Sequence, residues 1–216
     1  MEELNSKMSE MKVNKDINDE ELEMIVKNMR IKDDRGNIEE IKSKINRCNN
    51  LTQKCVYVRE LLSPQSTTFQ HIVMNDLGIN KPINNTSGDG CKNNINYEIK
   101  TSIHAKDSNQ NFVQIRPDHD IHFYILISYN LYDKTSPYGK AFILKIPSSN
   151  LYDLVIKYGG YAHGTCKKLG NITNGNIKGR NCEYSLRCSP NTTKGKNFVV
   201  WNELLKYEVD YIKENF

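Results

Sequence analysis

Hydrophobic residues recur with helical spacing along the first third of the chain. Leu22, Ile25, Val26 and Met29 form one stripe behind an acidic first turn, and Asn37 stands where a helix N-cap is expected before a second, isoleucine-rich stripe. A third apolar pattern ends at a glycine, which typically stops a helix. The pattern therefore predicts helices over residues 19–30, 37–45 and 67–77.

The centre of the chain changes to short segments rich in β-branched and aromatic residues, separated by clusters of turn-forming residues. This spacing predicts consecutive strands of one sheet, mostly an antiparallel meander, over residues 95–103, 112–116, 121–129 and 140–146. A helix capped by Ser148 is expected to follow as far as about Tyr158. Weak strand signals lie near 184–187, and Val199 to about Lys213 is expected to form a closing amphipathic helix, with Trp201 in the core.

Together these elements predict an α/β protein with a central mixed sheet flanked by helices and a helical N-terminal region. The length of 216 residues fits one domain, residues 1–216. Within it we expect a mainly helical part (1–80), a sheet core (85–150), an irregular basic segment (160–197) and the closing helix (198–216).

Composition and charge narrow the classes of protein. No apolar run is long enough for a membrane span, and the acidic N-terminus lacks the features of a signal peptide, so we expect a cytoplasmic protein without a membrane partner. In that reducing compartment the six cysteines are expected to be free thiols. The net charge is +4, but residues 1–50 carry 10 basic and 12 acidic side chains, so the positive charge lies further along the chain.

The positive charge is concentrated between Cys166 and Lys196, where seven basic residues accompany one acid, Glu183. Such a segment suits a surface that faces phosphates, because lysine and arginine displace counterions from DNA. A solvated loop would have the same composition, and charge alone does not decide between the two interpretations.

The most informative pattern is an aspartate between two glycines, Asp89, followed nine residues later by Glu98 and Lys100 in a predicted strand. Residues two apart in a strand point to the same face, so Ile99 points to the other, into a core. A hairpin over residues 90–97 would bring Glu98 back beside Asp89. Two adjacent carboxylates repel each other and raise each other's pKa, and a hard cation such as Mg²⁺ relieves the repulsion.

These residues resemble the PD-(D/E)xK motif of the restriction-endonuclease-like superfamily, with Gly88 in place of the usual proline. The resemblance covers about residues 55–150. It implies a restriction-endonuclease-like core and a Mg²⁺-dependent nuclease with Asp89, Glu98 and Lys100 as catalytic residues. It also implies a catalytic glutamine on the following strand, which Gln114 matches, and another acidic metal ligand on a preceding helix, for which Glu60 is the best candidate and Gln70 a weaker one.

Several features have plainer explanations that stay open. In the plainer interpretation of the motif, Asp89 is a turn residue, and Glu98 and Lys100 form an exposed cross-strand ion pair. Asp118, His119 and Asp120 fit a turn at a strand junction at least as well as a metal site. A zinc site is conceivable on one further set of residues, although their spacing is not a paired CxxC signature: His163, Cys166, Cys182 and Cys188.

The resemblance points to a type II restriction endonuclease that hydrolyses double-stranded DNA at a specific sequence. Cutting both strands of a symmetric site favours a homodimer, and a companion methyltransferase would protect the host. The basic segment and the strand before it supply side chains that suit DNA contacts: Lys178, Arg180, Arg187, Asn174 and Arg116. The alternatives are a structure-specific repair or recombination nuclease, a non-catalytic DNA-binding protein, and an interaction domain that binds no nucleic acid.

Overall fold

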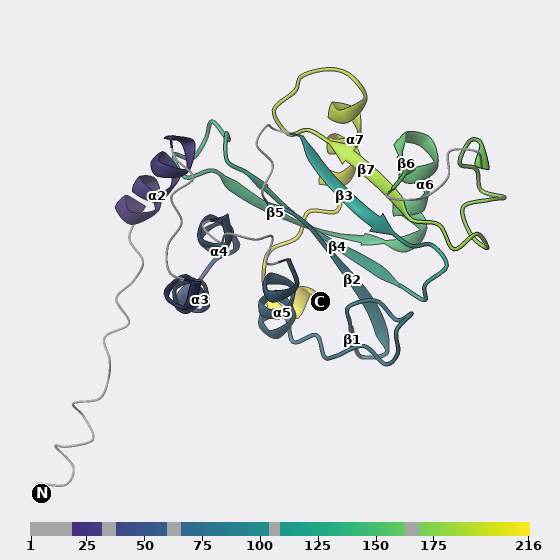
Figure 1. Cartoon of the computed structure of the whole chain (residues 1–216), viewed down its shortest axis with the longest axis horizontal. Helices are drawn as coiled ribbons and strands as arrows, with labels where there is room; N and C mark the ends of the chain where they lie inside the picture. The colour runs from purple at the N-terminus through teal and green to yellow at the C-terminus, as the bar shows by residue number, and fades with distance from the viewer. Residues whose placement is uncertain (1–18, 32–37, 60–65, 104–108, 163–168) are drawn as a thin grey trace, which may run out of the picture.

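The computed structural model describes residues 19–31, 38–59, 66–103, 109–162 and 169–216 (Figure 1). Within these ranges four helices precede the sheets: α2 (Asp19–Ile31), α3 (Ile38–Arg47), α4 (Leu51–Arg59) and α5 (Ser66–Leu77). The apolar stripe of α2 is buried at Leu22, Ile25 and Val26, as its spacing predicts. The helical first third is thus confirmed within the described ranges.

The central sheet has four strands in the order β1-β2-β4-β5. They are β1 (Gly90–Lys92), β2 (Ile95–Ser102), β4 (Phe123–Asn130) and β5 (Lys140–Pro147). The β1–β2 and β4–β5 pairs are antiparallel, whereas β2 and β4 are parallel. The protein is therefore α/β with a mixed central sheet flanked by helices, which confirms the expected fold class.

The expectation of one continuous meander is wrong at β3 (Gln110–Ile115). This strand leaves the central sheet and forms a second one, in the order β3-β7-β6, with β7 (Tyr184–Cys188) and β6 (Gly160–Tyr161). The position beside β2 belongs to β4, which is buried along almost its whole length, as a central strand must be. Burial in β3 instead alternates, which suits a strand with one solvent-facing side.

The C-terminal region also differs from its prediction. Helix α7 (Lys196–Leu205) ends well before Lys213, and a short 3₁₀ turn, η2 (Lys213–Asn215), follows later. Between them the backbone pairs with β5: the Lys145 N–H donates to Tyr207 O, and the Val209 N–H donates to Ile143 O. The backbone groups of residues 207 and 209 therefore form hydrogen bonds with the edge of β5. In a longer helix they would form hydrogen bonds within the helix.

Helix α6 (Ser148–Tyr158) agrees with its predicted range, but its cap does not. Pro147 holds the N-cap position, and the Ser148 hydroxyl donates to Ile121 O, 2.5 Å away, instead of capping the helix. Ser148 therefore links α6 to the segment before β4 through this hydrogen bond and does not cap the helix.

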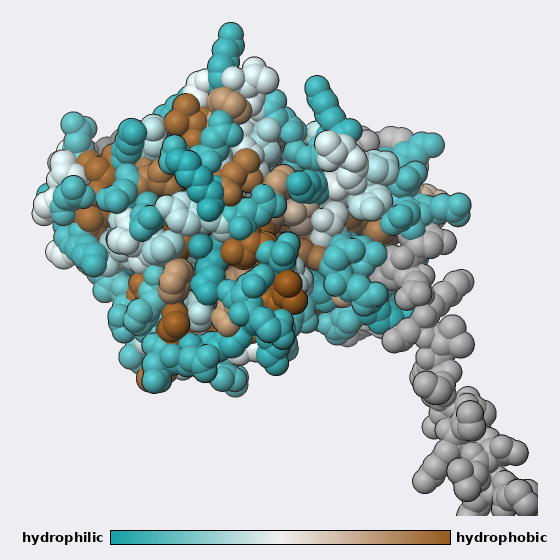
Figure 2. Space-filling model, turned by 180° about the vertical axis from the view of Figure 1, so that it is seen from behind, coloured by the Kyte–Doolittle hydropathy of each residue, from teal (hydrophilic) through white to brown (hydrophobic). Residues whose placement is uncertain are grey.

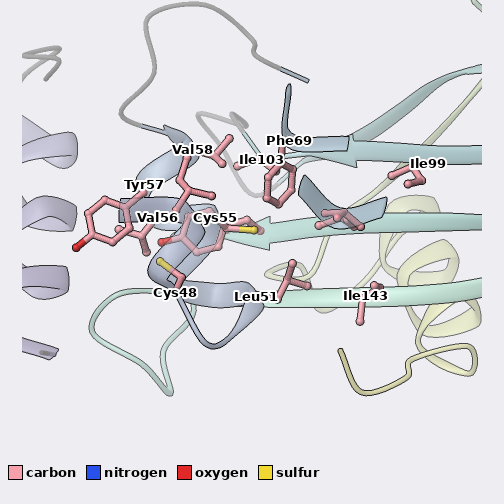
Figure 3. Packing of buried hydrophobic residues seen from close by; sticks show 14 of the residues in the cluster. Cys48, Leu51, Cys55, Val56, Tyr57, Val58, Phe69, Ile99, Ile103 and Ile143 are labelled. Carbon is pink, nitrogen blue, oxygen red and sulfur yellow. The ribbon is translucent and has the colours of Figure 1, made fainter. Parts of the chain in front are cut away.

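The two faces of the central sheet bury separate hydrophobic clusters. On one face, helices α4 and α5 cover residues such as Ile99 and Ile125, and Figure 3 shows this packing around Phe69 and Ile143. On the other face, α6, α7 and the second sheet cover Tyr124 and its neighbours, including the predicted core residue Trp201, which is 4% exposed. Alternate residues of β2 and β4 therefore belong to different layers.

The surface seen in Figure 2 is mostly hydrophilic, with separate hydrophobic patches. Met24, Ile83 and Ile212 are among the exposed apolar side chains. Within the described ranges no helix is both long and apolar enough to cross a membrane.

Candidate functional site

The predicted hairpin between Asp89 and Glu98 is present. Strands β1 and β2 pair Gly90 with Tyr97, and the turn between them is made by Asn93 and Asn94, which have φ values of 53° and 61°. Two consecutive residues with positive φ are typical of the tight turns that match strand twist, and asparagine tolerates this conformation well. The short turn returns β2 directly past the residues that precede β1.

Gly88 allows the close approach of the loop to β2. Its φ is +76°, and a Cβ atom there would lie 2.4 Å from the Tyr97 carbonyl oxygen and 3.2 Å from Glu98 Oε2. The next residue continues this contact, because the Asp89 N–H donates to Tyr97 O at 2.8 Å. A proline, whose φ is fixed near −65°, could not adopt the positive φ of residue 88.

Side chains complete the edge of β2 where β1 ends. The Ile99 N–H donates to Asp89 Oδ2 at 2.7 Å, and the Gln70 amide donates to Ile99 O at 2.8 Å. Both backbone groups of Ile99 are thereby satisfied without a neighbouring strand. The sequence offers Gln70 only as a weaker candidate than Glu60 for a metal ligand. In the structure its amide instead binds the backbone of Ile99, the residue between Glu98 and Lys100.

Glu98 and Lys100 share the face of β2 opposite Ile99, as predicted. The Glu98 side chain is 5% exposed and that of Lys100 is 11% exposed, and Lys100 Nζ lies 2.5 Å from Glu98 Oε1. A buried ion pair of this kind is a poor source of stability, because desolvation offsets most of its attraction. The interpretation of Glu98 and Lys100 as an exposed surface pair is therefore wrong.

Burial and, next to it, the negative charge of Glu98 raise the pKa of Asp89 to about 6, against the opposing effects of the Ile99 N–H, Lys100 and Arg116. The shift reports two carboxylates held close together in a partly desolvated place. Perturbed carboxyl groups of this kind cluster at functional sites.

The donor set fits a magnesium ion. One oxygen of each carboxylate already has a partner, namely the Ile99 N–H for Asp89 and the Lys100 ammonium for Glu98. The second oxygen of each has no hydrogen bond to any described residue. Mg²⁺ binds one or two carboxylates and keeps several waters, so two acids are sufficient. No larger group of His, Cys, Asp or Glu gathers among the described residues.

Two other predicted site residues, Gln114 and Glu60, are not placed at this centre. Gln114 is exposed, has a φ of +57°, and lies in the irregular stretch of β3 between Phe112 and Ile115. It is not on the neighbouring strand of the central sheet, where Tyr124 instead lies opposite Glu98. Its part in catalysis stays a prediction. Glu60 lies outside the described residues.

The segment after β3 is a turn that ties loops together. Asp118 accepts hydrogen bonds from the Gly179 and Asn181 N–H groups at 2.5 and 2.6 Å. The Asp120 N–H donates to Thr86 O, in the loop that leads to Asp89. These contacts favour the structural explanation of Asp118 and Asp120 over metal binding, and they place the basic segment and the Asp89 loop on either side of one turn.

His119, between these two aspartates, has its pKa lowered by burial and by the positive charges of Arg116 and Lys100. A lowered pKa keeps the imidazole neutral at pH 7.

Four predicted DNA contacts lie on exposed parts of the molecule: Lys178, Arg180, Arg187 and Asn174. The Arg180 guanidinium donates to Leu169 O at 3.1 Å. Arg116 differs from them, because its guanidinium binds Glu183 Oε1 through Nε at 2.9 Å and Nη2 at 2.6 Å. Glu183, the single acid of the basic segment, therefore neutralises the one candidate that lies outside that segment.

The proposed zinc set is only partly described. Cys182 and Cys188 are buried free thiols, while His163 and Cys166 lie outside the described residues. Burial raises the pKa of Cys188 to about 12, which opposes the thiolate form that zinc requires. Cys48, Cys55 and Cys91 are also free, as expected.

Sequence reasoning missed two tyrosines beside the site. Tyr124 lies opposite Glu98 on β4, and its ring meets that of Tyr152 on α6 at a centroid distance of 6.0 Å. No local signal places Tyr124 there, because the parallel pairing of β2 and β4 joins segments that are not adjacent in the chain.

Comparison of the chain with protein-family models, with curated proteins and with solved structures found no match in any of the three.

Proposed function

We propose that the protein is a Mg²⁺-dependent endonuclease that hydrolyses phosphodiester bonds in double-stranded DNA, in the manner of a type II restriction enzyme. The observation that carries the proposal is the convergence of Asp89, Glu98 and Lys100 at one end of the β1–β2 hairpin, with the carboxyl groups close enough to raise the pKa of Asp89. Their spacing in the sequence matches the motif that the chain resembles.

The two acids and the lysine have distinct parts in this proposal. Asp89 and Glu98 would hold Mg²⁺ through the carboxylate oxygens that have no hydrogen bond to a described residue. When bound, the ion supplies an activated water and neutralises charge on the phosphodiester. Lys100 lies against Glu98, where its ammonium can orient the attacking water and stabilise the negative charge that develops on phosphorus-bound oxygens.

The basic segment supports DNA as the substrate. Asp118 ties its backbone to the turn that also contacts the loop before Asp89, so DNA bound along the exposed bases would lie beside the candidate centre. Phosphate contacts from Arg180 and Arg187 would set affinity and position. Cleavage of both strands would require two copies of the centre, which favours a homodimer.

Incubation with a long, sequenced, unmethylated DNA tests the proposal. The wild type with Mg²⁺ should give discrete fragments, and wild type in EDTA and the Glu98→Gln variant should give none. Lys206→Ala, which removes an exposed ion pair with Glu203 on α7, should cut like the wild type. No cleavage by folded wild-type protein with either Mg²⁺ or Mn²⁺ would overturn the proposal and favour a DNA-binding role.

A continuous smear or cleavage confined to ends, flaps or mismatches would retain the chemistry but exclude sequence-specific restriction. Sedimentation at micromolar concentration, with and without DNA, tests the dimer. A monomer under both conditions would contradict the homodimer and favour a nicking or repair nuclease.

A further inference from the structure

A pocket of about 370 Å³ lies between the turn after β3, helix α6 and the basic segment. Part of its wall is apolar, and this part is formed by Ile121, Tyr152, Ile156 and Ile177. Its volume is at the lower end of the range in which proteins enclose small organic ligands. The pocket has no part in the chemistry proposed above.

The pocket is two side chains away from Glu98. Tyr124 lies opposite Glu98 on the adjacent strand, roughly 5 Å away as neighbouring strands are. The Tyr124 ring meets the Tyr152 ring edge-on, and Tyr152 lines the pocket.

The polar part of the wall favours a neutral ligand that donates hydrogen bonds. It contains two carboxylates, Asp120 and Asp153, against one lysine, Lys178, whose ammonium lies 5.7 Å from the centroid of the Tyr152 ring. A phosphate would meet a net negative wall and is disfavoured. A flat, mostly apolar ring that carries an amino group suits both parts of the wall.

We infer that this pocket binds a single nucleobase turned out of the DNA helix, an inference that rests on the proposed function. Enzymes that act on such bases hold them between apolar side chains and read their edges with polar groups. Asp153 can accept a hydrogen bond from the exocyclic amino group of adenine, cytosine or guanine. Thymine offers only its ring N3–H, whose two flanking carbonyl oxygens would be repelled by the carboxylate. The pocket should therefore prefer the three amino-bearing bases to thymine.

The pocket also gives part of the basic segment a defined task. Asn174, Ile177 and Lys178 come from that segment and form one side of the pocket. Asp118 fixes the segment through the Gly179 and Asn181 N–H groups directly after them. Asn174 and Lys178, predicted from the sequence to touch DNA, would contact an extruded base rather than a groove.

Titration of the metal-free full chain with dAMP, dCMP, dGMP and dTMP tests the inference, with 2-deoxyribose 5-phosphate as the probe that lacks a base. Methyl resonances of isoleucine report on Ile121, Ile156 and Ile177. We expect saturable shifts with the amino-bearing nucleotides at millimolar concentration and at least about fivefold weaker binding of dTMP. Equal shifts with deoxyribose phosphate, or none with any nucleotide up to about 10 mM, would overturn the inference.

Two surface variants separate the pocket from general effects. Asn174→Trp should block the pocket and remove the shifts, while Asn171→Trp, exposed in the same loop but not part of the lining, should retain them. Asp153→Asn should remove the preference over dTMP. Equal binding by Asn174→Trp and wild type would count against this pocket.

The experiment needs no cleavage, so the two proposals fail separately. Nucleotide binding without DNA cleavage would leave the base pocket and overturn the nuclease. DNA cleavage without nucleotide binding would leave the nuclease proposal and overturn the base pocket.

Discussion

The two faces of strand β2 differ in what they bury and in what that burial does. Ile99 is fully buried among helices α4 and α5 with Phe69 and Val73, in a layer held by apolar contacts. On the opposite face Glu98 is almost as deeply buried and pairs with Lys100, whose side chain is 11% exposed. Apolar burial stabilises the fold, whereas buried charges cost desolvation energy.

This difference indicates how the protein positions its proposed chemistry. The helical face fixes β2 from behind, and Gln70 holds the Ile99 carbonyl oxygen from the same side. The other face can then hold two carboxylates and a lysine that do not stabilise each other greatly. Stability and the proposed function are therefore assigned to alternate residues of one strand.

The largest effect is expected from adding a single methyl group to the loop beside the charged face. Gly88→Ala should lower the free energy of unfolding by about 2 to 4 kcal/mol and abolish cleavage, because its Cβ would press on Tyr97 O and Glu98 Oε2. Thermal melts and cleavage assays would measure both effects.

Gly170→Ala is the matched control for this substitution. Gly170 has nearly the same φ, +75°, but beyond its chain neighbours no atom of a described residue lies within 4 Å of its added Cβ. It should lose only about 1 to 2 kcal/mol and keep full activity. Equal losses in the two variants would show that backbone strain, rather than contact with the centre, is responsible.

A second prediction concerns the cost of the ionised Asp89. Its pKa is about 6 in the folded protein and near 3.9 when unfolded, so the folded state binds this proton more tightly. In the metal-free protein Asp89 therefore costs stability as pH rises from about 4 to 6, and the full cost, about 2 to 3 kcal/mol, persists above pH 6. Asp89→Asn should then be more stable than wild type at pH 8 and equal to it below pH 4.

Unfolding measured between pH 4 and 8 would check this prediction. Added Mg²⁺ should stabilise the wild type at pH 8 and leave Asp89→Asn unchanged, because the ion binds the folded carboxylates. If the difference in free energy of unfolding between the two proteins did not change with pH, the ionised Asp89 would not be the source of the cost.

The smallest expected effect lies outside both faces of β2, in the basic segment. Replacing Arg180 and Arg187 together with alanine should weaken DNA binding about tenfold and reduce the salt dependence by the equivalent of about two phosphate contacts. The fold should persist, since both side chains are exposed. Binding measured over a range of salt concentrations would show it, and unchanged cleavage of cognate and near-cognate sites would count against it.

Much of the architecture follows from local patterns in the sequence. The helical stripe with Leu22 and Val26, the hairpin after Asp89 and the alternation of Glu98, Ile99 and Lys100 all depend on residues close together in the chain. Their periodicity is therefore visible before folding. The central part of the candidate site was predictable for the same reason.

The remainder depends on contacts between distant segments. The parallel pairing of β2 with β4 brings Tyr124 beside Glu98 and sends β3 to a second sheet with Gln114. Likewise, the residues after Leu205 pair with β5 instead of extending α7. No local pattern distinguishes these outcomes, because the competing partners are more than ten residues away.

The central claim is that neighbouring residues of β2 divide between proposed chemistry and core, and one paired measurement tests it most directly. Cleavage rate and free energy of unfolding should be measured for Lys100→Ala and Ile99→Val. We predict that Lys100→Ala loses cleavage by about 10²- to 10³-fold and also loses stability, because Glu98 is left buried without its partner. Ile99→Val should lose only about 0.5 to 1.5 kcal/mol of stability and still cut DNA. Folded Lys100→Ala protein that cuts DNA at the wild-type rate would contradict the account.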